Sequence, residues 1–344
     1  MKNEIIRWGI LGCGDVTERK SGPALQKATG SQLVAVMRRD AGKAEDYARR
    51  HGVPFRTNDA DELIHRDDVD IVYVATPPGA HLELALKVCA AGKPCYVEKP
   101  MARSAAESSA MLDAFRKAGL PLFVAFYRRG LDRFTTTKRL LDEGRIGKLT
   151  GLIYSFENKH KADLDPAGLP WRLEAVNAGA GLFYDLGSHL LDVLDFILGP
   201  LGNVTGLAAN MASAYDVEDT VAMSFSAMGA PCVAKWNFAG SQGRDRIEFE
   251  GTKGKITLSC FGGDPVRLET SAGVEEFPGE LPPHVHQQLV QTIVEELRGS
   301  GKCPSTGESA LRTMKVMDAV LEEYYGGRED DFWNRAATWP GRRK

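Results

Sequence analysis

The chain lacks the features that mark membrane proteins, nucleic-acid-binding proteins and cysteine-based metal sites. None of its apolar runs is long enough to cross a bilayer, and its start, MKNEIIRWG, carries an acidic residue and leads directly into a strand-like run, unlike a signal peptide. A net charge of −3 provides neither a basic surface for nucleic acid nor a strongly acidic tail. The six cysteines show no metal-ligand spacing. We therefore expect a soluble, cytoplasmic protein with reduced, buried thiols and with no nucleic-acid or membrane partner.

The most informative segment is residues 5–17, IIRWGILGCGDVT, in which an apolar run gives way to a glycine turn and then to a helix-compatible stretch. Gly12 can make the tight turn after a strand, and Gly14 lets the backbone approach a pyrophosphate at the positive end of the following helix. The third small position of the G-x-G-x-x-G/A pattern falls on Thr17, which we expect to fit less closely against the strand. The segment predicts a dinucleotide-binding turn.

This turn opens a series of strands and helices that alternate along the first 125 residues. The strands are continuous apolar runs, so helices should cover both faces of their sheet. Residues 1–125 therefore predict a Rossmann domain with a doubly wound parallel sheet. The expected later strands are 33–37, 70–76, 94–97 and 122–126, and the expected helices are 44–50, 81–91 and 104–118.

The remainder, residues 126–344, has a different pattern. Several strand candidates follow one another without intervening helices and are joined by turns, which is typical of an antiparallel sheet. With 344 residues, 43% of them apolar, the chain can bury a second core. We predict an α+β domain with an open, mostly antiparallel sheet and helices on one face. Its expected strands are 148–158, 204–212, 220–226, 232–238, 246–249 and 255–259, and its expected helices are 132–143, 180–198, 284–298 and 308–325.

Five groups of residues occur in the order and approximate spacing of one known family. They are Gly12-Cys13-Gly14-Asp15-Val16, Ala75-Thr76-Pro77-Pro78 with His81, Glu98-Lys99-Pro100, Trp171-Arg172, and Asp185-Leu186-Gly187-Ser188-His189. Over nearly its whole length the chain resembles the glucose–fructose oxidoreductase and inositol dehydrogenase (Gfo/Idh/MocA) family. The resemblance implies NAD(P)-dependent oxidation or reduction of a hydroxyl or carbonyl group on a sugar, cyclitol or related polyol.

The same resemblance implies the residues of the site. Cofactor contacts are implied for Gly12, Gly14, Asp15, Val16, Thr76, Pro77, His81, Glu98 and Lys99. Substrate contacts are implied for Lys99, Trp171, Arg172, Asp185 and His189. To these we add Tyr127, which directly follows the last parallel strand and either lines the pocket or caps the core. The loop at 159–170 is expected to help shape the substrate pocket.

The chemistry of alcohol oxidation assigns roles to these residues. It needs a base for the hydroxyl proton and a positive group that favours alkoxide character. Lys99 follows the carboxyl end of a strand, where open parallel sheets bind ligands, and its ammonium can polarise the reacting oxygen. Asp185 and His189 are four apart on a predicted helix, so the carboxylate can orient the imidazole while the ring exchanges the proton. Asp192 lies on the same face and can hydrogen-bond a second hydroxyl.

Each of these residues also has a structural interpretation. A lysine before a proline is commonly a solvated loop residue, and an Asp and a His four apart are commonly a surface pair or a buried pair. With Asp192 they also suggest a metal site, which we do not expect because no further ligand cluster stands out and hydride transfer needs no metal. Trp171 and Arg172 can equally be a buried tryptophan beside a surface arginine.

The end of the second strand, Val36-Met37-Arg38-Arg39, bears on the choice of dinucleotide. An acidic residue there accepts hydrogen bonds from the ribose of NAD, and the family often carries this acid where Arg38 stands. A guanidinium at Arg38 can instead bind a 2′-phosphate through two hydrogen bonds, with added charge from Arg39. The alternative is that both arginines are solvated and Asp40 reaches back to an unphosphorylated ribose. We expect NADP in preference to NAD.

Three functions are compatible with these residues. The first is an NAD(P)-dependent sugar or polyol dehydrogenase or reductase with Lys99, Asp185 and His189 as its working groups. The second is a nucleotide-binding redox sensor without turnover, and the third is a glycosidase that uses bound NAD for transient oxidation. The open sheet also predicts a homodimer or homotetramer, because its flat face is of a kind that another subunit often covers.

Overall fold

The computed structural model describes residues 4–159 and 168–343, which form two compact units. The chain passes between the units several times, whereas the sequence suggested a single boundary at residue 125. The first unit contains the described residues up to 102 together with 107–131 and 282–311, and the second contains 103–106, 132–281 and the described residues from 312 onward.

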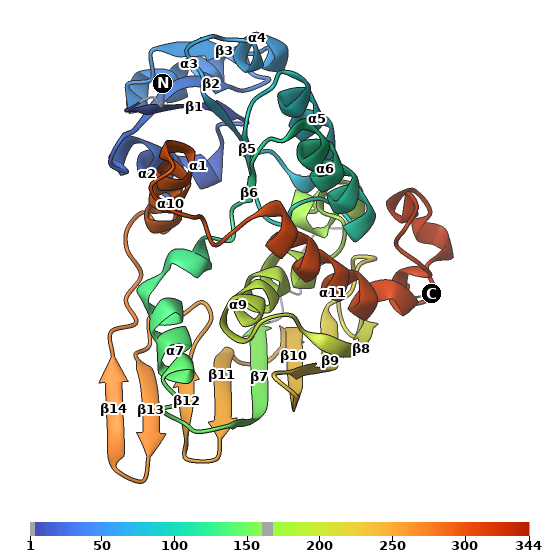
Figure 1. Ribbon diagram of the computed structural model, residues 1–344. Helices are drawn as coiled ribbons and strands as arrows, with labels where there is room; N and C mark the ends of the chain where they lie inside the picture. Colours follow the sequence, from blue (N-terminus) through green and yellow to red (C-terminus); the bar gives the residue numbers. More distant parts are fainter. Residues whose placement is uncertain (1–3, 160–167, 344) are drawn as a thin grey trace. The chain divides into compact units, whose positions relative to one another are not determined.

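A six-stranded parallel sheet forms the framework of the first unit, with the strand order β3-β2-β1-β4-β5-β6 (Figure 1). Its strands β4 and β5 are entirely buried, as the continuous apolar runs predicted. The order reverses between β1 and β4, and open sheets of this kind bind ligands beside the carboxyl ends of the strands at such a reversal. The strands are β1 (Ile6–Leu11), β2 (Ser31–Met37), β3 (Phe55–Thr57), β4 (Ile71–Val74), β5 (Cys95–Val97) and β6 (Leu122–Val124).

Helices connect these strands and pack along them. Specific residues define both ends of helix α3. At its start the Asp40 carboxylate accepts a hydrogen bond from the Lys43 backbone N–H, and at its end Gly52 has a φ of 65°. The helices of this part are α1 (Asp15–Arg19), α2 (Gly22–Lys27), α3 (Ala41–His51), α4 (Ala60–Ile64), α5 (His81–Ala90) and α6 (Ala105–Ala118).

A segment from late in the chain, residues 282–311, completes the first unit. Its helix α10 (Gln287–Arg298) packs against α2. The Val124 backbone N–H in β6 donates to the Ser305 carbonyl at 3.2 Å, and the Ser305 hydroxyl donates to the Val124 carbonyl at 2.7 Å. The outer strand of the parallel sheet is therefore covered by residues that are synthesised almost last.

An eight-stranded sheet forms the framework of the second unit, in the order β14-β13-β12-β11-β7-β10-β9-β8. Its pairings are antiparallel except that of β7 with β10. Buried and exposed residues alternate along β9 and β10, so one face packs on the core and the other is open. The strands are β7 (Leu149–Lys159), β8 (Gly202–Ala209), β9 (Thr220–Ala227), β10 (Ala230–Gly240), β11 (Arg244–Gly251), β12 (Gly254–Leu258), β13 (Val266–Thr270) and β14 (Gly273–Phe277).

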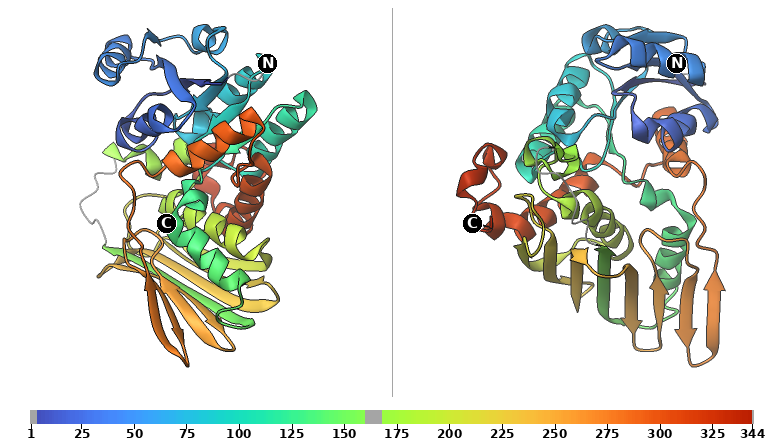
Figure 2. Two further views of the ribbon diagram at one scale, coloured as in Figure 1. Left: turned by 60° about the vertical axis from the view of Figure 1, so that its left-hand side comes forward. Right: turned by 180° about the vertical axis from the view of Figure 1, so that it is seen from behind.

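Helices cover one face of this second sheet, as Figure 2 shows. Ten of the eleven residues of α9 are buried, because this helix lies in the centre of that layer. The helices are α7 (Asp132–Asp142), α8 (Ala175–Ala178), α9 (Ser188–Leu198) and α11 (Gly307–Tyr325), of which the last begins in the first unit and continues in the second from residue 312.

The predicted fold class is confirmed, and the differences are local. The helix expected over 180–198 is divided: a π-helical turn, η5 (Phe183–Gly187), precedes α9. The short strands β3, β13 and β14 were not predicted. Within the described residues no helix combines the length and apolar character that crossing a membrane requires.

Candidate active site

The glycine turn after β1 has the geometry that the sequence predicted. Gly12 has a φ of +89°, and a Cβ atom added to it would lie 2.8 Å from the Thr76 methyl carbon and 3.1 Å from the Thr76 backbone nitrogen. A larger residue is therefore excluded both by conformation and by space. Around Gly14 an added Cβ would meet only the Gly12 carbonyl oxygen, at 3.8 Å, so the backbone there is open to a close ligand.

The surroundings of this turn fit a dinucleotide. Thr76 lies two residues after β4, and its hydroxyl oxygen is buried and has no hydrogen-bond partner among the described residues. Thr17 is fully buried, and its hydroxyl donates to the Gly14 carbonyl at 2.7 Å, so this larger side chain stabilises the turn from within. The open backbone at Gly14 and the unsatisfied hydroxyl of Thr76 lie on either side of the strand-order reversal, where a pyrophosphate would be held. Asp15 and Val16 open α1, and Pro77 is exposed after Thr76.

Arg38 lies beside the same turn. Its guanidinium donates to the Cys13 carbonyl at 3.1 Å and is half-buried, whereas Arg39 is exposed. Asp40 caps α3 by accepting from the Lys43 N–H at 3.1 Å, and this bond lowers the pKa of its carboxyl. The arginine, rather than the aspartate, is the side chain bonded to the glycine turn.

His81 links two loops at the carboxyl ends of the strands. Its Nε2 lies 2.7 Å from the Thr76 carbonyl oxygen, and its Nδ1 lies 3.1 Å from the Pro100 carbonyl oxygen. The ring is fully buried, and this burial lowers its pKa, while the neighbouring carbonyl oxygens of Thr76, Met101 and Pro100 oppose the change. His81 thus supports the loop after β4 and the loop that carries Lys99 from inside the protein.

Lys99 follows β5, and its backbone is held by the preceding side chain. The Lys99 N–H donates to the Glu98 Oε2 at 3.0 Å, and the Tyr73 hydroxyl donates to the Glu98 Oε1 at 2.5 Å. Glu98 is only 7% exposed, and this burial raises the pKa of its carboxyl, while the positive charge of Lys99 opposes the rise. A buried acidic side chain is therefore next to the predicted catalytic lysine.

His286 extends this group of polar side chains from the late segment of the chain. Its Nδ1 lies 3.1 Å from the Tyr96 hydroxyl, and its ring stacks on Tyr127 with centroids 4.7 Å apart. Burial, together with the charges of Lys20, Lys99 and Arg128, lowers the pKa of His286 to about 3. The ring is neutral at ordinary pH, so its 3.8 Å approach to Glu98 is not an ion pair.

The second unit holds the other predicted residues. Asp185 lies in the π-helical turn, and its Oδ2 is 3.3 Å from the Nε of Arg172. The Arg172 guanidinium also lies over the Trp171 ring, 4.4 Å from its centroid. These three side chains therefore form one cluster. Residues 160–167 of the predicted pocket loop lie outside the described residues.

His189 and Asp192 follow on α9, in the buried layer over the sheet. His189 is 5% exposed and meets the Phe261 ring edge-on at 5.9 Å. Asp192 is fully buried and accepts from the Thr313 hydroxyl of α11 at 3.4 Å. This burial favours a structural role for Asp192. Within the part of the chain that the structure describes, no group of three or more His, Cys, Asp or Glu residues is placed to hold a metal ion.

Comparison with known proteins agrees with this arrangement. Residues 6–126 match the oxidoreductase family with an NAD-binding Rossmann fold, and residues 134–257 match the GFO/IDH/MocA C-terminal domain. Oxidoreductase P35 of Formosa agariphila is 33% identical over 316 residues, which cover 91% of this chain and 97% of that protein. The chain belongs to the Gfo/Idh/MocA family. It is an NAD(P)-dependent oxidoreductase.

Other members of the family are more distant. A 1,5-anhydro-D-fructose reductase of Ensifer adhaerens is 27% identical, with 92% of this chain and 95% of that protein covered. The structure of a levoglucosan dehydrogenase in complex with NADH and levoglucosan matches with a TM-score of 0.80 and 22% identity, covering 92% of this chain and 96% of that one. At this identity the structural match shows a shared fold.

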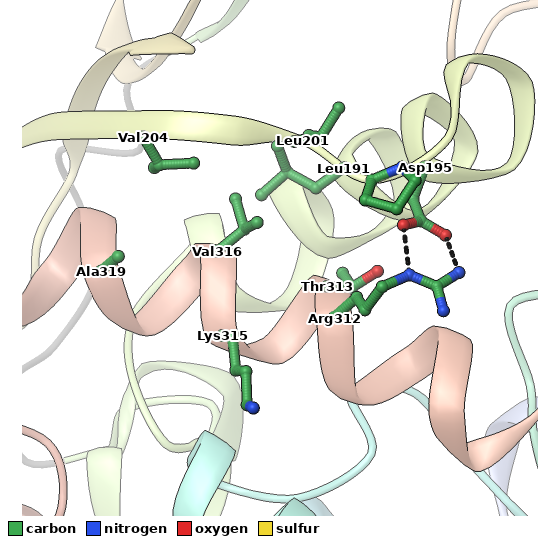
Figure 3. Close-up of a pocket in the computed structure, with 10 residues that line it drawn as sticks. Leu191, Asp195, Leu201, Val204, Arg312, Thr313, Lys315, Val316 and Ala319 are labelled. Carbon is green, nitrogen blue, oxygen red and sulfur yellow. Dashed lines mark hydrogen bonds and ion pairs between the residues drawn. The ribbon is translucent and has the colours of Figure 1, made fainter. Parts of the chain in front are cut away.

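This oxidoreductase also has a cavity away from the predicted site residues. A cavity of about 270 Å³ lies between α9, α11 and the start of β8, and the bidentate pair of Asp195 and Arg312 closes one side of it, at 2.7 and 2.8 Å (Figure 3). The remaining walls are mainly aliphatic. They are formed by Leu191, Pro200, Leu201, Val204, Thr313, Lys315, Val316 and Ala319.

Sequence reasoning missed several polar residues near Lys99. Tyr73 and Tyr96 lie at paired positions of β4 and β5, and their rings stack 4.7 Å apart. A tyrosine in a strand buried on both faces must find a partner for its hydroxyl, which is a signal that the sequence did contain. Nothing in the local sequence of His286 indicates that it packs beside Glu98.

Proposed function

We propose that this oxidoreductase acts on a hydroxyl or carbonyl group of a sugar, cyclitol or related polyol, with NADP as its preferred cofactor. The proposal rests on the position of Lys99 at the carboxyl end of β5, where a buried carboxyl group binds its backbone N–H. The same sheet also has the open glycine turn. Relatives named 1,5-anhydro-D-fructose reductase and inositol 2-dehydrogenase support the substrate class.

When bound, the nicotinamide supplies or accepts the hydride. We assign to the Lys99 ammonium the stabilisation of negative charge on the substrate oxygen. His189 takes the hydroxyl proton in oxidation and returns it in reduction. Asp185 and its partner Arg172 contact further hydroxyl groups of the substrate, and Trp171 contributes an apolar surface of the kind that packs on sugar rings.

The preference for NADP rests on the two side chains after β2. Arg38 is directed toward the glycine turn by its bond to the Cys13 carbonyl, and a guanidinium there binds a 2′-phosphate. Asp40 is engaged as the cap of α3, which disfavours a role on an unphosphorylated ribose.

The experiment is a substrate screen followed by nicotinamide absorbance. The protein is incubated with NADP or NAD and a panel of sugars and inositols, and in the reverse direction with NADPH or NADH and keto sugars. Net change of the cofactor with a polyol supports the proposal. Release of p-nitrophenol from nitrophenyl glycosides without net change would identify the glycosidase, and binding of cofactor without any turnover would identify the sensor.

We further propose that a second copy of the chain covers the open face of the eight-stranded sheet. Ile153, Leu207 and Val233 are 45, 66 and 50% exposed there. Ile153 and Val233 are directly paired on β7 and β10, and Leu207 lies on β8, on the other side of β9. A self-complementary pairing of this face gives a closed dimer, and two such dimers give a tetramer. Light scattering after gel filtration tests this: a monomeric mass at micromolar concentration contradicts it.

A further inference from the structure

We propose that Glu98 and Tyr73 form a buried positioning pair that fixes the backbone of Lys99 for the reaction. This inference rests on the proposed function, in which Lys99 acts on the reacting oxygen. Neither residue needs to touch the substrate. They act on the Lys99 backbone, which sets the position and direction of the Lys99 side chain.

The hydrogen bonds of Glu98 define the pair. One carboxylate oxygen accepts from the Lys99 backbone N–H at 3.0 Å, and the other accepts from the Tyr73 hydroxyl at 2.5 Å. The first bond ties the side chain of one residue to the backbone of the next, so it fixes the peptide that sets the direction of the Lys99 Cα–Cβ bond. Hydrogen bonds to an ionised group are the stronger kind.

The other side of Lys99 is held as well. Nδ1 of the buried His81 ring lies 3.1 Å from the Pro100 carbonyl oxygen and 3.3 Å from the Met101 carbonyl oxygen. Lys99 is therefore between two supported peptides and is itself only half-buried. Such a fixed backbone reduces the conformational freedom that a flexible lysine must lose to reach its productive position.

The charges around Glu98 determine when the pair is intact. Tyr73 faces it from β4, Lys99 from its own loop, Lys20 from the end of α1 and the neutral His286 from the segment before α10. Tyr96 and Arg128 lie beyond His286, whose ring is bonded to Tyr96. Desolvation raises the pKa of Glu98, whereas Lys99, Lys20 and the Tyr73 hydroxyl oppose this. The anchoring bond is strongest to the carboxylate, so turnover should fall as the pH drops through the raised pKa.

The test compares Glu98→Gln and Tyr73→Phe with wild type on a substrate from the screen. Glutamine has the same shape but is neutral and presents only one acceptor oxygen. Either Tyr73 or the Lys99 N–H therefore loses its acceptor on residue 98, and the remaining hydrogen bond is no longer to a charged group. We expect kcat of Glu98→Gln to fall about tenfold to a hundredfold, in line with a hydrogen bond to a charged group. The affinity for NADPH, measured by fluorescence titration, should change less than about threefold, because the carboxyl group of Glu98 is buried against Tyr73 and the Lys99 backbone and the glycine turn is untouched.

The pH profile separates positioning from a general loss of structure. In the reduction direction, in which His189 must carry a proton, we expect the wild-type kcat to have an acid limb that reports Glu98. Tyr73→Phe removes a donor to the carboxylate, so it should move this limb to higher pH. Glu98→Gln should abolish it. An unchanged acid limb in both variants, or a kcat of Glu98→Gln within a factor of three of wild type, overturns the proposal.

Two further variants make the result specific. Asp70→Asn removes an acidic group at the opposite end of β4, where Asp70 pairs with Arg7, and should leave kcat and its pH profile unchanged. Lys99→Met separates the two proposals: if it retains wild-type turnover, the proposed function of Lys99 fails. If it is inactive while Glu98→Gln behaves as wild type, only the positioning pair fails.

Discussion

The two units use their buried polar side chains differently. In the first, buried polar groups gather at the carboxyl ends of parallel strands, around Lys99 and the glycine turn. In the second, they bond to each other and to backbone: Arg328 binds the Asp318 carboxylate and the carbonyl oxygens of Gly179 and Arg103, and is only 3% exposed.

The difference follows from the two kinds of sheet. A parallel sheet covered on both faces exposes its strand ends, and polar groups there can serve a ligand. The second sheet is covered by helices on one face, and the irregular segments between those helices need buried partners for their backbone groups. Changes in the first unit should therefore affect turnover, and most polar changes in the second should affect stability.

Of these changes, His189→Ala is expected to lower turnover most. It would be an exception to the division between turnover and stability, because His189 belongs to the second unit. Loss of a general base costs roughly two to four powers of ten in rate. Oxidation should fall most near neutral pH and recover partly at high pH, where solvent accepts the proton. A pH series of kcat measures this, with exposed His65→Ala as control; a wild-type profile would assign the proton to another group.

Lys99→Met should lower kcat by about a hundredfold to a thousandfold, the usual cost of one preorganised charge. Cofactor affinity should be nearly intact, which steady-state rates and fluorescence titration determine together. Lys87→Met, on α5, removes a partly exposed lysine that pairs with Asp61 and should match wild type. More than a third of wild-type kcat in Lys99→Met would refute the assigned role.

Arg38→Asp should reverse the preference between NADPH and NADH. Charge-assisted hydrogen bonds contribute about 1.5 to 3 kcal/mol, so the wild type should favour NADPH about tenfold or more. Titration of both cofactors checks this. Arg49→Asp, an exposed charge change on α3, is the matched control. Tighter NADH binding by wild type would remove Arg38 from the cofactor site.

Glu218→Gln should change stability and its pH dependence, as expected for the second unit. Glu218 is fully buried, accepts from the Gly181 N–H at 3.0 Å and from the Tyr325 hydroxyl, and burial raises the pKa of its carboxyl to about 7. The folded state thus binds more protons than the unfolded state between about pH 4.5 and 7. The stabilisation is complete below that window and is lost as the pH rises through 7.

The raised pKa of Glu218 corresponds to a difference in unfolding free energy on the order of 3 kcal/mol between about pH 4.5 and 7. The glutamine variant should flatten this part of the curve of unfolding free energy against pH, measured by urea unfolding. Glu322→Gln, an exposed change on the same helix as Tyr325, should leave the curve as in wild type. An equal slope in Glu218→Gln and wild type would contradict the assignment.

The sequence predicted the elements with strong local patterns and missed those without one. In the parallel strands and in β9 and β10, the order of apolar and polar residues indicates which positions are buried. Strand β14 is exposed at four of its five positions, so no apolar period marks it, and β3 has only three residues. The π-helical turn at 183–187 lies in an apolar stretch whose composition is the same for either kind of helix.

Polar neighbours on one strand or loop could be predicted from the sequence, and those assembled from distant parts of the chain could not. Lys99 and Glu98 are neighbours in a recognisable motif. Tyr96 and His286 are 190 positions apart, and only the folded chain brings them together. For Asp192 the local pattern was misleading. Its position on the predicted helix suggested a ligand contact, whereas in the structure α11 packs on α9 and Asp192 is buried against Thr313.

The return of residues 282–311 to the first unit has a consequence for biosynthesis and for protein engineering. The ribosome releases β1 to β6 long before it makes Ser305, which bonds to β6, and α10, which packs on α2. The nascent cofactor-binding region therefore remains incomplete until nearly nine-tenths of the chain has been translated. A chimera that exchanges this region between two relatives must carry the late segment with it, because a single crossover near residue 131 would pair one parent's sheet with the other's closing helix.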